Sequence, residues 1–174
     1  MKRARRPRQD PKRVAGDKQG SLPVRAAAPP LSILLVEDNP ADARLVSELL
    51  GPTETAGRLS AVSDGEAAME FLRRTGRYSE AARPDVVLLD LNLPVKNGLE
   101  VLAEIKGDPE LKRIPVVILT GSSRQEDIAR AYELHANCYI IKPANIDDFA
   151  RVAKSLNDFW SKIAQLPEDS PNGR

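Results

Sequence analysis

Polar and charged residues follow four short apolar runs of the sequence, each at the position where a run ends. The runs are residues 33–36, 86–89, 116–119 and 139–141; the residues that follow them are Glu37 and Asp38, Asp90, Thr120, and Lys142. An acid after a strand is often only a helix cap or a solvated loop residue. Several carboxylates, a hydroxyl and an ammonium brought together, however, are the groups that bind a divalent cation and support phosphoryl transfer. Their joint placement is therefore the first indication of a site.

The four runs predict strands that place these residues on one edge of a sheet. Continuous apolar runs this short, rich in β-branched residues, are typical of parallel strands buried on both faces. A weaker alternating stretch, residues 59–62, fits an edge strand. Helical patterns separate the runs and begin at capping residues: Asn39, Asp64, Ser123 with Glu126, and Asn145. The sequence thus predicts an α/β fold, a doubly wound five-stranded parallel sheet with five helices, whose site lies beyond the carboxyl ends of the strands.

Electrostatic repulsion in such a site indicates a bound cation. Two carboxylates about 4 Å apart repel by about 4 kcal/mol at an effective dielectric near 20, and one lysine cannot balance three of them. Oxygen ligands favour Mg²⁺, with Mn²⁺ as the alternative, over zinc. With such an ion bound, Asp90 could attack a phosphoryl group and form an aspartyl phosphate. Lys142 and the metal would stabilise the charge, and Thr120 would donate a hydrogen bond to a phosphoryl oxygen.

Composition limits the class of protein. The chain has 174 residues, of which 29% are charged and 41% hydrophobic, as expected of one soluble globular domain. No run approaches the roughly 18 apolar residues of a membrane span, and no apolar segment follows the basic N-terminus as in a secretory signal. These features predict a cytoplasmic protein without a membrane partner. The single cysteine, Cys138, excludes a disulfide framework and a structural zinc site.

The charge is unevenly distributed. Residues 1–30 carry nine Lys/Arg against two Asp, a net charge of +7 that leaves −6 for the rest of the chain. Their richness in Pro, Gly and Ala predicts a disordered basic tail, followed by a folded domain over residues 31–166 and a short disordered tail over residues 167–174. Without interleaved aromatic residues or a base-reading motif, the basic tail does not favour a nucleic-acid partner, and we interpret it as a solvating extension.

The motifs around these residues resemble the receiver domain of two-component response regulators. Four motifs carry the likeness, in the family's order: residues 34–39, residues 87–94 with Gly98, residues 118–120 and residues 139–143. The resemblance implies a flavodoxin-like sheet of strand order 2-1-3-4-5 with Asp90 as the phosphoacceptor. It also implies that Asp38, Asp90 and the backbone carbonyl of Asn92 bind Mg²⁺ directly, with Glu37 acting through water. Glu37 departs from the commoner Asp of this family.

The same resemblance assigns roles to the remaining residues of the motifs. Thr120 and Tyr139 would form a switch pair, Lys142 would contact the phosphoryl group, and the peptide bond before Pro143 would be cis, a form that X-Pro bonds reach at modest cost. The protein would be a phosphoacceptor signalling protein rather than an enzyme, with only self-catalysed phosphotransfer and slow autodephosphorylation. Its donor would be a sensor histidine kinase or a phosphotransfer protein.

A finer likeness concerns the partners. Residues 92–98, 105–111 and 136–137, and a last helix ending in Phe159-Trp160, resemble the stand-alone regulators paired with bacterial phytochromes. Those relatives commonly form homodimers through the last two helices. The apolar stripe between Ile146 and Ile163, about 27 Å long on a helix, is longer than one small sheet can cover and suits such an interface.

Two other classes of function remain as alternatives. A Mg²⁺-dependent phosphohydrolase with an Asp nucleophile usually has a second Asp two residues later, where this chain has Asn92. A non-phosphorylated interaction module would not need the pocket residues, all of which are present here.

Overall fold

The computed structural model describes residues 31–50 and 56–167 as five β-α units. Five parallel strands form one sheet of order β2-β1-β3-β4-β5, which confirms the predicted fold. The strands are β1 (Leu31–Val36), β2 (Ala56–Val62), β3 (Val86–Leu89), β4 (Val116–Thr120) and β5 (Cys138–Ile141). The α-helices are α1 (Pro40–Leu50), α2 (Gly65–Arg73), α3 (Gly98–Gly107), α4 (Gln125–Glu133) and α5 (Ile146–Asp158), with short helical turns η1 (Gly76–Tyr78) and η2 (Phe159–Ile163). The predicted tails, residues 1–30 and all but Pro167 of residues 167–174, lie outside the described residues.

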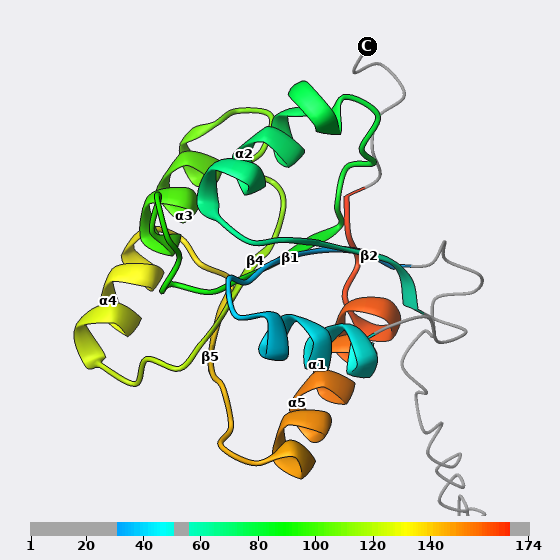
Figure 1. Cartoon of the computed structure of the whole chain (residues 1–174), viewed down its shortest axis with the longest axis vertical. Helices are drawn as coiled ribbons and strands as arrows, with labels where there is room; N and C mark the ends of the chain where they lie inside the picture. Colours follow the sequence, from blue (N-terminus) through cyan, green and yellow to red (C-terminus); the bar gives the residue numbers. More distant parts are fainter. Residues whose placement is uncertain (1–30, 51–55, 168–174) are drawn as a thin grey trace, which may run out of the picture.

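Helices cover both faces of the sheet. α1 and α5 pack on one face, and α2, α3 and α4 on the other (Figure 1). Residues that alternate along β1, β3 and β4 therefore belong to two separate apolar cores, and every residue of β3 and β4 is buried. Burial on both faces explains why these strands are continuous apolar runs rather than alternating ones. No helix in the described part of the chain is both long and apolar enough to span a bilayer.

The register of the central strands brings the residues after β1 and β3 together. β1 pairs with β2 on one side and β3 on the other, so strand order reverses at this point. Val36 lies opposite Leu89, and the backbone N–H of Asp90 donates to the Val36 carbonyl at 3.0 Å. Glu37 and Asp90 consequently follow paired positions at the carboxyl edge of the sheet, where ligands bind in doubly wound folds.

Three of the four predicted helix caps are present. Side-chain oxygens of Asn39, Asp64 and Asn145 accept backbone hydrogen bonds of 2.9, 2.7 and 2.8 Å from the first turns of α1, α2 and α5. The capping box predicted at Ser123 is wrong, because the N-cap of α4 is Arg124, one residue later, with no side-chain cap. A capping box at Asn97 and Glu100 instead begins α3.

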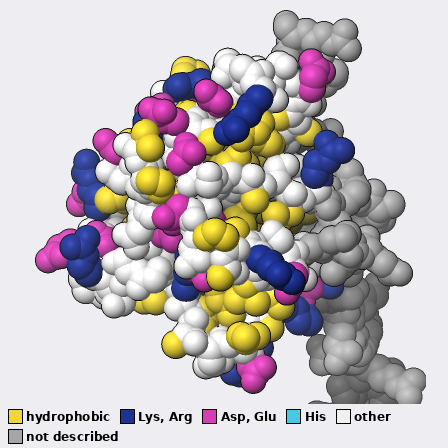
Figure 2. Space-filling view, in the orientation of Figure 1, with side chains coloured by type: hydrophobic (Ala, Val, Ile, Leu, Met, Phe, Trp, Pro, Cys, Tyr) yellow, Lys and Arg dark blue, Asp and Glu magenta, His cyan; other side chains and the backbone are white. Residues whose placement is uncertain are grey.

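The last helix is not regular to its end. α5 stops at Asp158 and continues into the wider π-helical turn η2, which contains the edge-to-face pair Phe159 and Trp160 with ring centroids 5.0 Å apart. Phe149 and Ala153 of α5 are buried, whereas Phe159 and Ile163 remain 46% and 58% exposed. Charged side chains lie over most of this face, and apolar side chains form a patch among them in its lower part, around α1 and α5 (Figure 2).

Val95, in the loop between β3 and α3, has a strained backbone. Its φ is +66°, which is unfavourable for a β-branched residue, and the N–H of Lys96 donates to the Pro94 carbonyl at 2.7 Å across it. Its side chain is 79% exposed and so gains little from packing. We expect Val95→Gly to raise the free energy of unfolding by about 1 kcal/mol, because relief of the strain exceeds the extra chain entropy of glycine.

Chemical denaturation of the full chain measures this effect. Val95→Ala serves as the control, since it keeps a Cβ at the same positive φ and should gain less than half as much. A lower stability for Val95→Gly would show that the turn is not strained.

Candidate functional site

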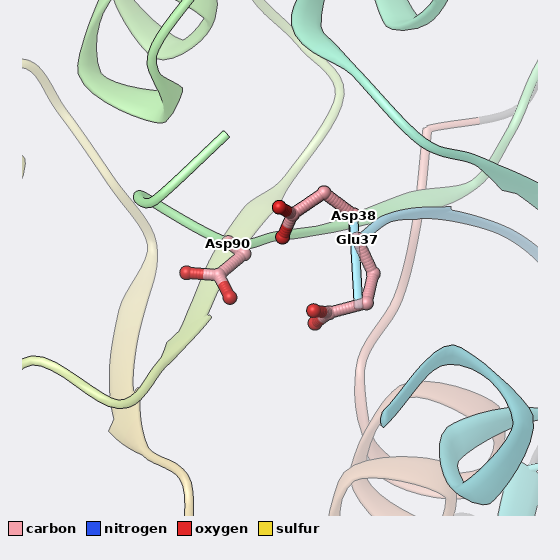
Figure 3. Close-up of side chains that lie close together, drawn as sticks. All are labelled: Glu37, Asp38 and Asp90. Atoms are coloured by element: carbon pink, nitrogen blue, oxygen red, sulfur yellow. The ribbon is translucent and has the colours of Figure 1, made fainter. Parts of the chain in front are cut away.

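Three carboxylates converge at the carboxyl edge of the sheet. Glu37 and Asp38 follow β1 and Asp90 follows β3, and each offers an oxygen that lies within 4.8 Å of the other two. Their side chains point into one common space (Figure 3). Glu37 and Asp90 are buried, at 4% and 5% exposure, whereas Asp38 is exposed. This arrangement has two fixed, buried acids and a third acid open to solvent.

Lys142 provides the positive charge of the site. Immediately after β5, its Nζ donates hydrogen bonds to Glu37 Oε2 at 2.6 Å, Asp90 Oδ2 at 2.7 Å and Asp42 Oδ2 at 2.9 Å. The backbone N–H of Lys142 continues the β4–β5 ladder by donating to the Thr120 carbonyl at 2.7 Å, which fixes where the side chain starts. The ammonium therefore bridges the residues that follow β1 and β3 and a residue of α1.

Asp90 is held on its other oxygen by two donors. Asp90 Oδ1 accepts a hydrogen bond from the Thr120 hydroxyl at 2.7 Å and another from the Asn92 backbone N–H at 3.1 Å. Thr120 is fully buried. The structure thus brings Glu37, Asp38, Asp90, Thr120 and Lys142 to one place, with Asn92 directly beside them.

Asp42 is a residue of this site that the sequence analysis did not identify. Its place in the first turn of a helix suggests only a favourable interaction with the helix N-terminus. The available signal was its spacing: Asp42 follows Glu37 by five residues, and α1 begins between them at the same sheet edge. A carboxylate in that turn can face the strand ends, as it does here.

The ionisation of the site follows from burial and its hydrogen bonds. Burial raises the pKa of Glu37 above its usual range, despite its bond to Lys142. Burial acts in the same direction on Asp90, but hydrogen bonds from Lys142, Thr120 and the Asn92 backbone outweigh it and lower the Asp90 pKa. For Lys142, burial favours the neutral form, yet its three carboxylate partners raise the pKa above the ordinary value. Of the two buried acids, Asp90 is therefore the one whose surroundings favour the ionised form.

The donor set fits a hard divalent cation. An octahedral ion with ligand distances of about 2.1 Å spaces its oxygen ligands about 3 to 4 Å apart, which is compatible with three carboxylate oxygens that lie within 4.8 Å of one another. Together with Asp42, four carboxylates face a single ammonium, a formal charge of −3. A divalent cation would reduce this charge to −1. Glu37, Asp38 and Asp90 are the side chains placed to hold it.

The two remaining predictions concern Tyr139 and Pro143. The Tyr139 hydroxyl donates to the Ser122 carbonyl at 3.0 Å, and the Ser122 N–H points to the Thr120 hydroxyl at 3.4 Å, so the tyrosine reaches the loop that follows Thr120. The predicted cis bond before Pro143 is wrong, since no peptide bond of the described residues is cis. The trans form is the lower in energy by about 0.5–1 kcal/mol, and Lys142 reaches its three carboxylates without the cis form.

Comparisons with known proteins agree on one family. The family model of the response regulator receiver domain matches residues 33–154. Response regulator Rcp1 of Synechocystis sp. is 50% identical over 139 residues, which cover 80% of this chain and 95% of Rcp1.

Two crystal structures are similar over about four fifths of the chain. The phosphorylated cyanobacterial phytochrome response regulator RcpA is 50% identical, with a TM-score of 0.78 over 80% of this chain and 100% of RcpA. The Mn²⁺-bound form of Rcp1 is 49% identical, with a TM-score of 0.75 over 79% of this chain and 99% of Rcp1.

Proposed function

The chain belongs to the response regulator receiver domain family, and from this premise we propose that it accepts a phosphoryl group on Asp90 from a sensor histidine kinase. The observation that carries this assignment is the environment of Asp90. Its carboxylate is buried, kept anionic, and held between the Lys142 ammonium and the Thr120 hydroxyl beside two further acids. These groups suit a nucleophile that must receive a dianionic phosphoryl group.

The proposed transfer makes one bond and breaks one bond. A carboxylate oxygen of Asp90 attacks phosphorus, and the P–N bond of the donor phosphohistidine breaks with its electron pair passing to the imidazole nitrogen. Lys142 and Thr120 already lie at 2.7 Å from the two Asp90 oxygens, so short movements bring their hydrogen atoms to the oxygens of the arriving group. The product is a mixed carboxylic–phosphoric anhydride on Asp90.

Mg²⁺ is part of this proposal, with Mn²⁺ as a substitute. Asp38, Asp90 and the backbone carbonyl of Asn92 would bind the ion directly, and Glu37 would act through water. When bound, the ion supplies positive charge that offsets the charge of the phosphoryl group during transfer. The crystal structure of the related Rcp1 in its Mn²⁺-bound form supports a divalent cation at this site.

Thr120 and Tyr139 would carry the signal away from the site. Once Asp90 is phosphorylated, the Thr120 hydroxyl donates its hydrogen bond to a phosphoryl oxygen instead of to Asp90 Oδ1. Ser122, whose carbonyl accepts from Tyr139, is attached to the same loop, so the tyrosine ring moves with it. The surface formed by α4, β5 and α5 would then change.

The partner assignments rest on the relatives. Membership of this family implies a histidine kinase as partner, and the likeness to a cyanobacterial phytochrome response regulator favours a phytochrome as that kinase. We further propose that residues 31–166 form the receiver domain and that it acts in the cytoplasm. A phosphotransfer protein would be the alternative donor.

A phosphorylation experiment tests the proposal. The full chain is incubated with acetyl phosphate and Mg²⁺, and the adduct is located by mass spectrometry after trapping with borohydride. We expect one base-labile phosphoryl group on Asp90, formed only with a divalent ion. Steady release of phosphate from unrelated phosphomonoesters would instead identify the phosphohydrolase, and no adduct at all would favour the non-phosphorylated interaction module.

We also propose that the chain forms a homodimer through its last two helices. An apolar groove of about 720 Å³ lies between β5 and α5, with Cys138, Ile140, Leu156, Phe159 and Trp160 among its lining residues. Phe159 and Ile163 leave apolar surface exposed beside it. A contiguous exposed apolar surface, unlike single exposed apolar side chains, is typical of a protein interface.

Trp160→Ala tests the homodimer. Aromatic residues at the centre of an interface contribute about 2 kcal/mol or more to binding. We therefore expect the dissociation constant of the dimer to rise at least roughly thirtyfold. Sedimentation velocity, run with and without a phosphate mimic, measures this change. Val95→Ala, which truncates an exposed apolar side chain in the loop between β3 and α3, should leave the dimer unchanged. A wild-type chain that stays monomeric at all concentrations would exclude the proposal.

A further inference from the structure

Every N–H bond of the Lys142 ammonium is engaged by a carboxylate. An ammonium has three donors, and Nζ lies at hydrogen-bond distance from Glu37, Asp42 and Asp90. The lysine side chain is 12% exposed, so water is a poor substitute for any of these partners. The three carboxylates together therefore fix the position of the ammonium.

The three acids differ in what phosphorylation demands of them. Glu37 and Asp90 belong to the carboxylate cluster that fits a cation, and Asp90 also receives the phosphoryl group. Asp42 belongs to α1 and is not part of that cluster. Its side chain is 36% exposed, against 1% for Glu37 and 7% for Asp90. Asp42 is thus the one partner of Lys142 that neither the cation nor the phosphoryl group takes.

We infer that Asp42 is a positioning residue for the phosphorylation of Asp90, acting through Lys142. This inference rests on the proposed function. As Asp90 loses its negative charge to the new bond, the third N–H of Lys142 turns to a phosphoryl oxygen. The bond from Lys142 to Asp42 keeps the ammonium at the site during this exchange. Asp42 itself touches neither the phosphoryl group nor the cation.

Asp42→Asn tests the inference through the rate of labelling. With acetyl phosphate and saturating Mg²⁺, we expect the full-length variant to label Asp90 about tenfold more slowly, as befits one charge-assisted hydrogen bond. Asp42→Glu keeps the carboxylate and should recover most of the rate. Glu48→Gln is the matched control, since Glu48 lies on the same helix and, among the residues that the structure describes, forms an ion pair with the exposed Arg44 alone. Its rate should equal that of the wild type.

Two measurements separate positioning from other roles. In a Lys142→Met background, Asp42→Asn should change the rate less than twofold, because the residue acts through the lysine. A tenfold loss there would overturn the inference. Calorimetric titration with Mn²⁺ should give Asp42→Asn an affinity within threefold of the wild type, whereas Asp38→Asn should lose at least tenfold. An equal loss in both would make Asp42 a metal ligand and also overturn the inference.

The wild-type chain keeps the two proposals distinguishable. If the wild type is not labelled on Asp90, the proposed function fails. If the wild type is labelled and Asp42→Asn is labelled at the same rate, only the inference about Asp42 fails.

Discussion

Asp90→Asn is expected to reduce phosphoryl labelling to background, a loss of at least about a thousandfold. The amide nitrogen cannot act as the nucleophile, and the remaining amide oxygen carries no negative charge with which to attack phosphorus. Other acids of the site do not replace Asp90: Asp38 is exposed, and the Glu37 carboxylate is bound to Lys142 without the support that Thr120 and Asn92 give to Asp90. Mass spectrometry of the trapped adduct measures the loss.

The fold should survive this substitution. The side-chain oxygen of an asparagine can still accept hydrogen bonds from Thr120 and the Asn92 N–H. The hydrogen bond from Lys142 is lost, but Lys142 keeps Glu37 and Asp42 as partners, so we expect the free energy of unfolding to fall by about 1 to 2 kcal/mol, which leaves the domain folded. Asp64→Asn is the matched control, because asparagine caps a helix as well as aspartate does. Labelling that persists in Asp90→Asn would show that another residue is the acceptor.

The strands were predictable because their burial leaves a direct trace in the sequence. β3 and β4 lie between two helical layers, so each position must be apolar, and the first polar residue marks the strand end. Parallel strands bring those ends to one edge. Asp90 and Thr120 could therefore be placed together from the sequence, and the structure puts them 2.7 Å apart.

Other features were out of reach because they depend on contacts between distant segments. Asp42 and Lys142 are 100 residues apart, and their ion pair requires the first turn of α1 to face the end of β5. The start of α4 was misplaced because serines at 122 and 123 both satisfy a capping pattern, and the structure instead pairs the Ser122 hydroxyl with Asp127. The positive φ of Val95 has no sequence signal, since valine is an unfavourable residue there.

Gly98→Ala is expected to lower the free energy of unfolding by about 3 kcal/mol. A Cβ at this position would lie 2.1 Å from the backbone carbonyl oxygen of Asp90 and 2.7 Å from the Leu91 Cα. Both are backbone atoms, so no side-chain rotation can relieve the clash, and α3 or the loop after β3 must shift by about an ångström. The N–H of Gly98 donates to the Leu91 carbonyl at 3.0 Å, which holds the start of α3 against that loop.

Gly107, at the other end of α3, provides a control position in the same helix. A Cβ there would meet nothing within 4 Å, and the residue is helical and exposed. Gly107→Ala should raise the free energy of unfolding by about 0.5 kcal/mol through helix propensity. Thermal unfolding should then separate the variants by about 10 °C, at about 3 °C per kcal/mol. Because the clash falls on the backbone of Asp90 itself, Gly98→Ala should also slow labelling, whereas Gly107→Ala should not. Equal stability in the two variants would mean that the loop after Asp90 can shift away from α3 with little loss in the free energy of unfolding.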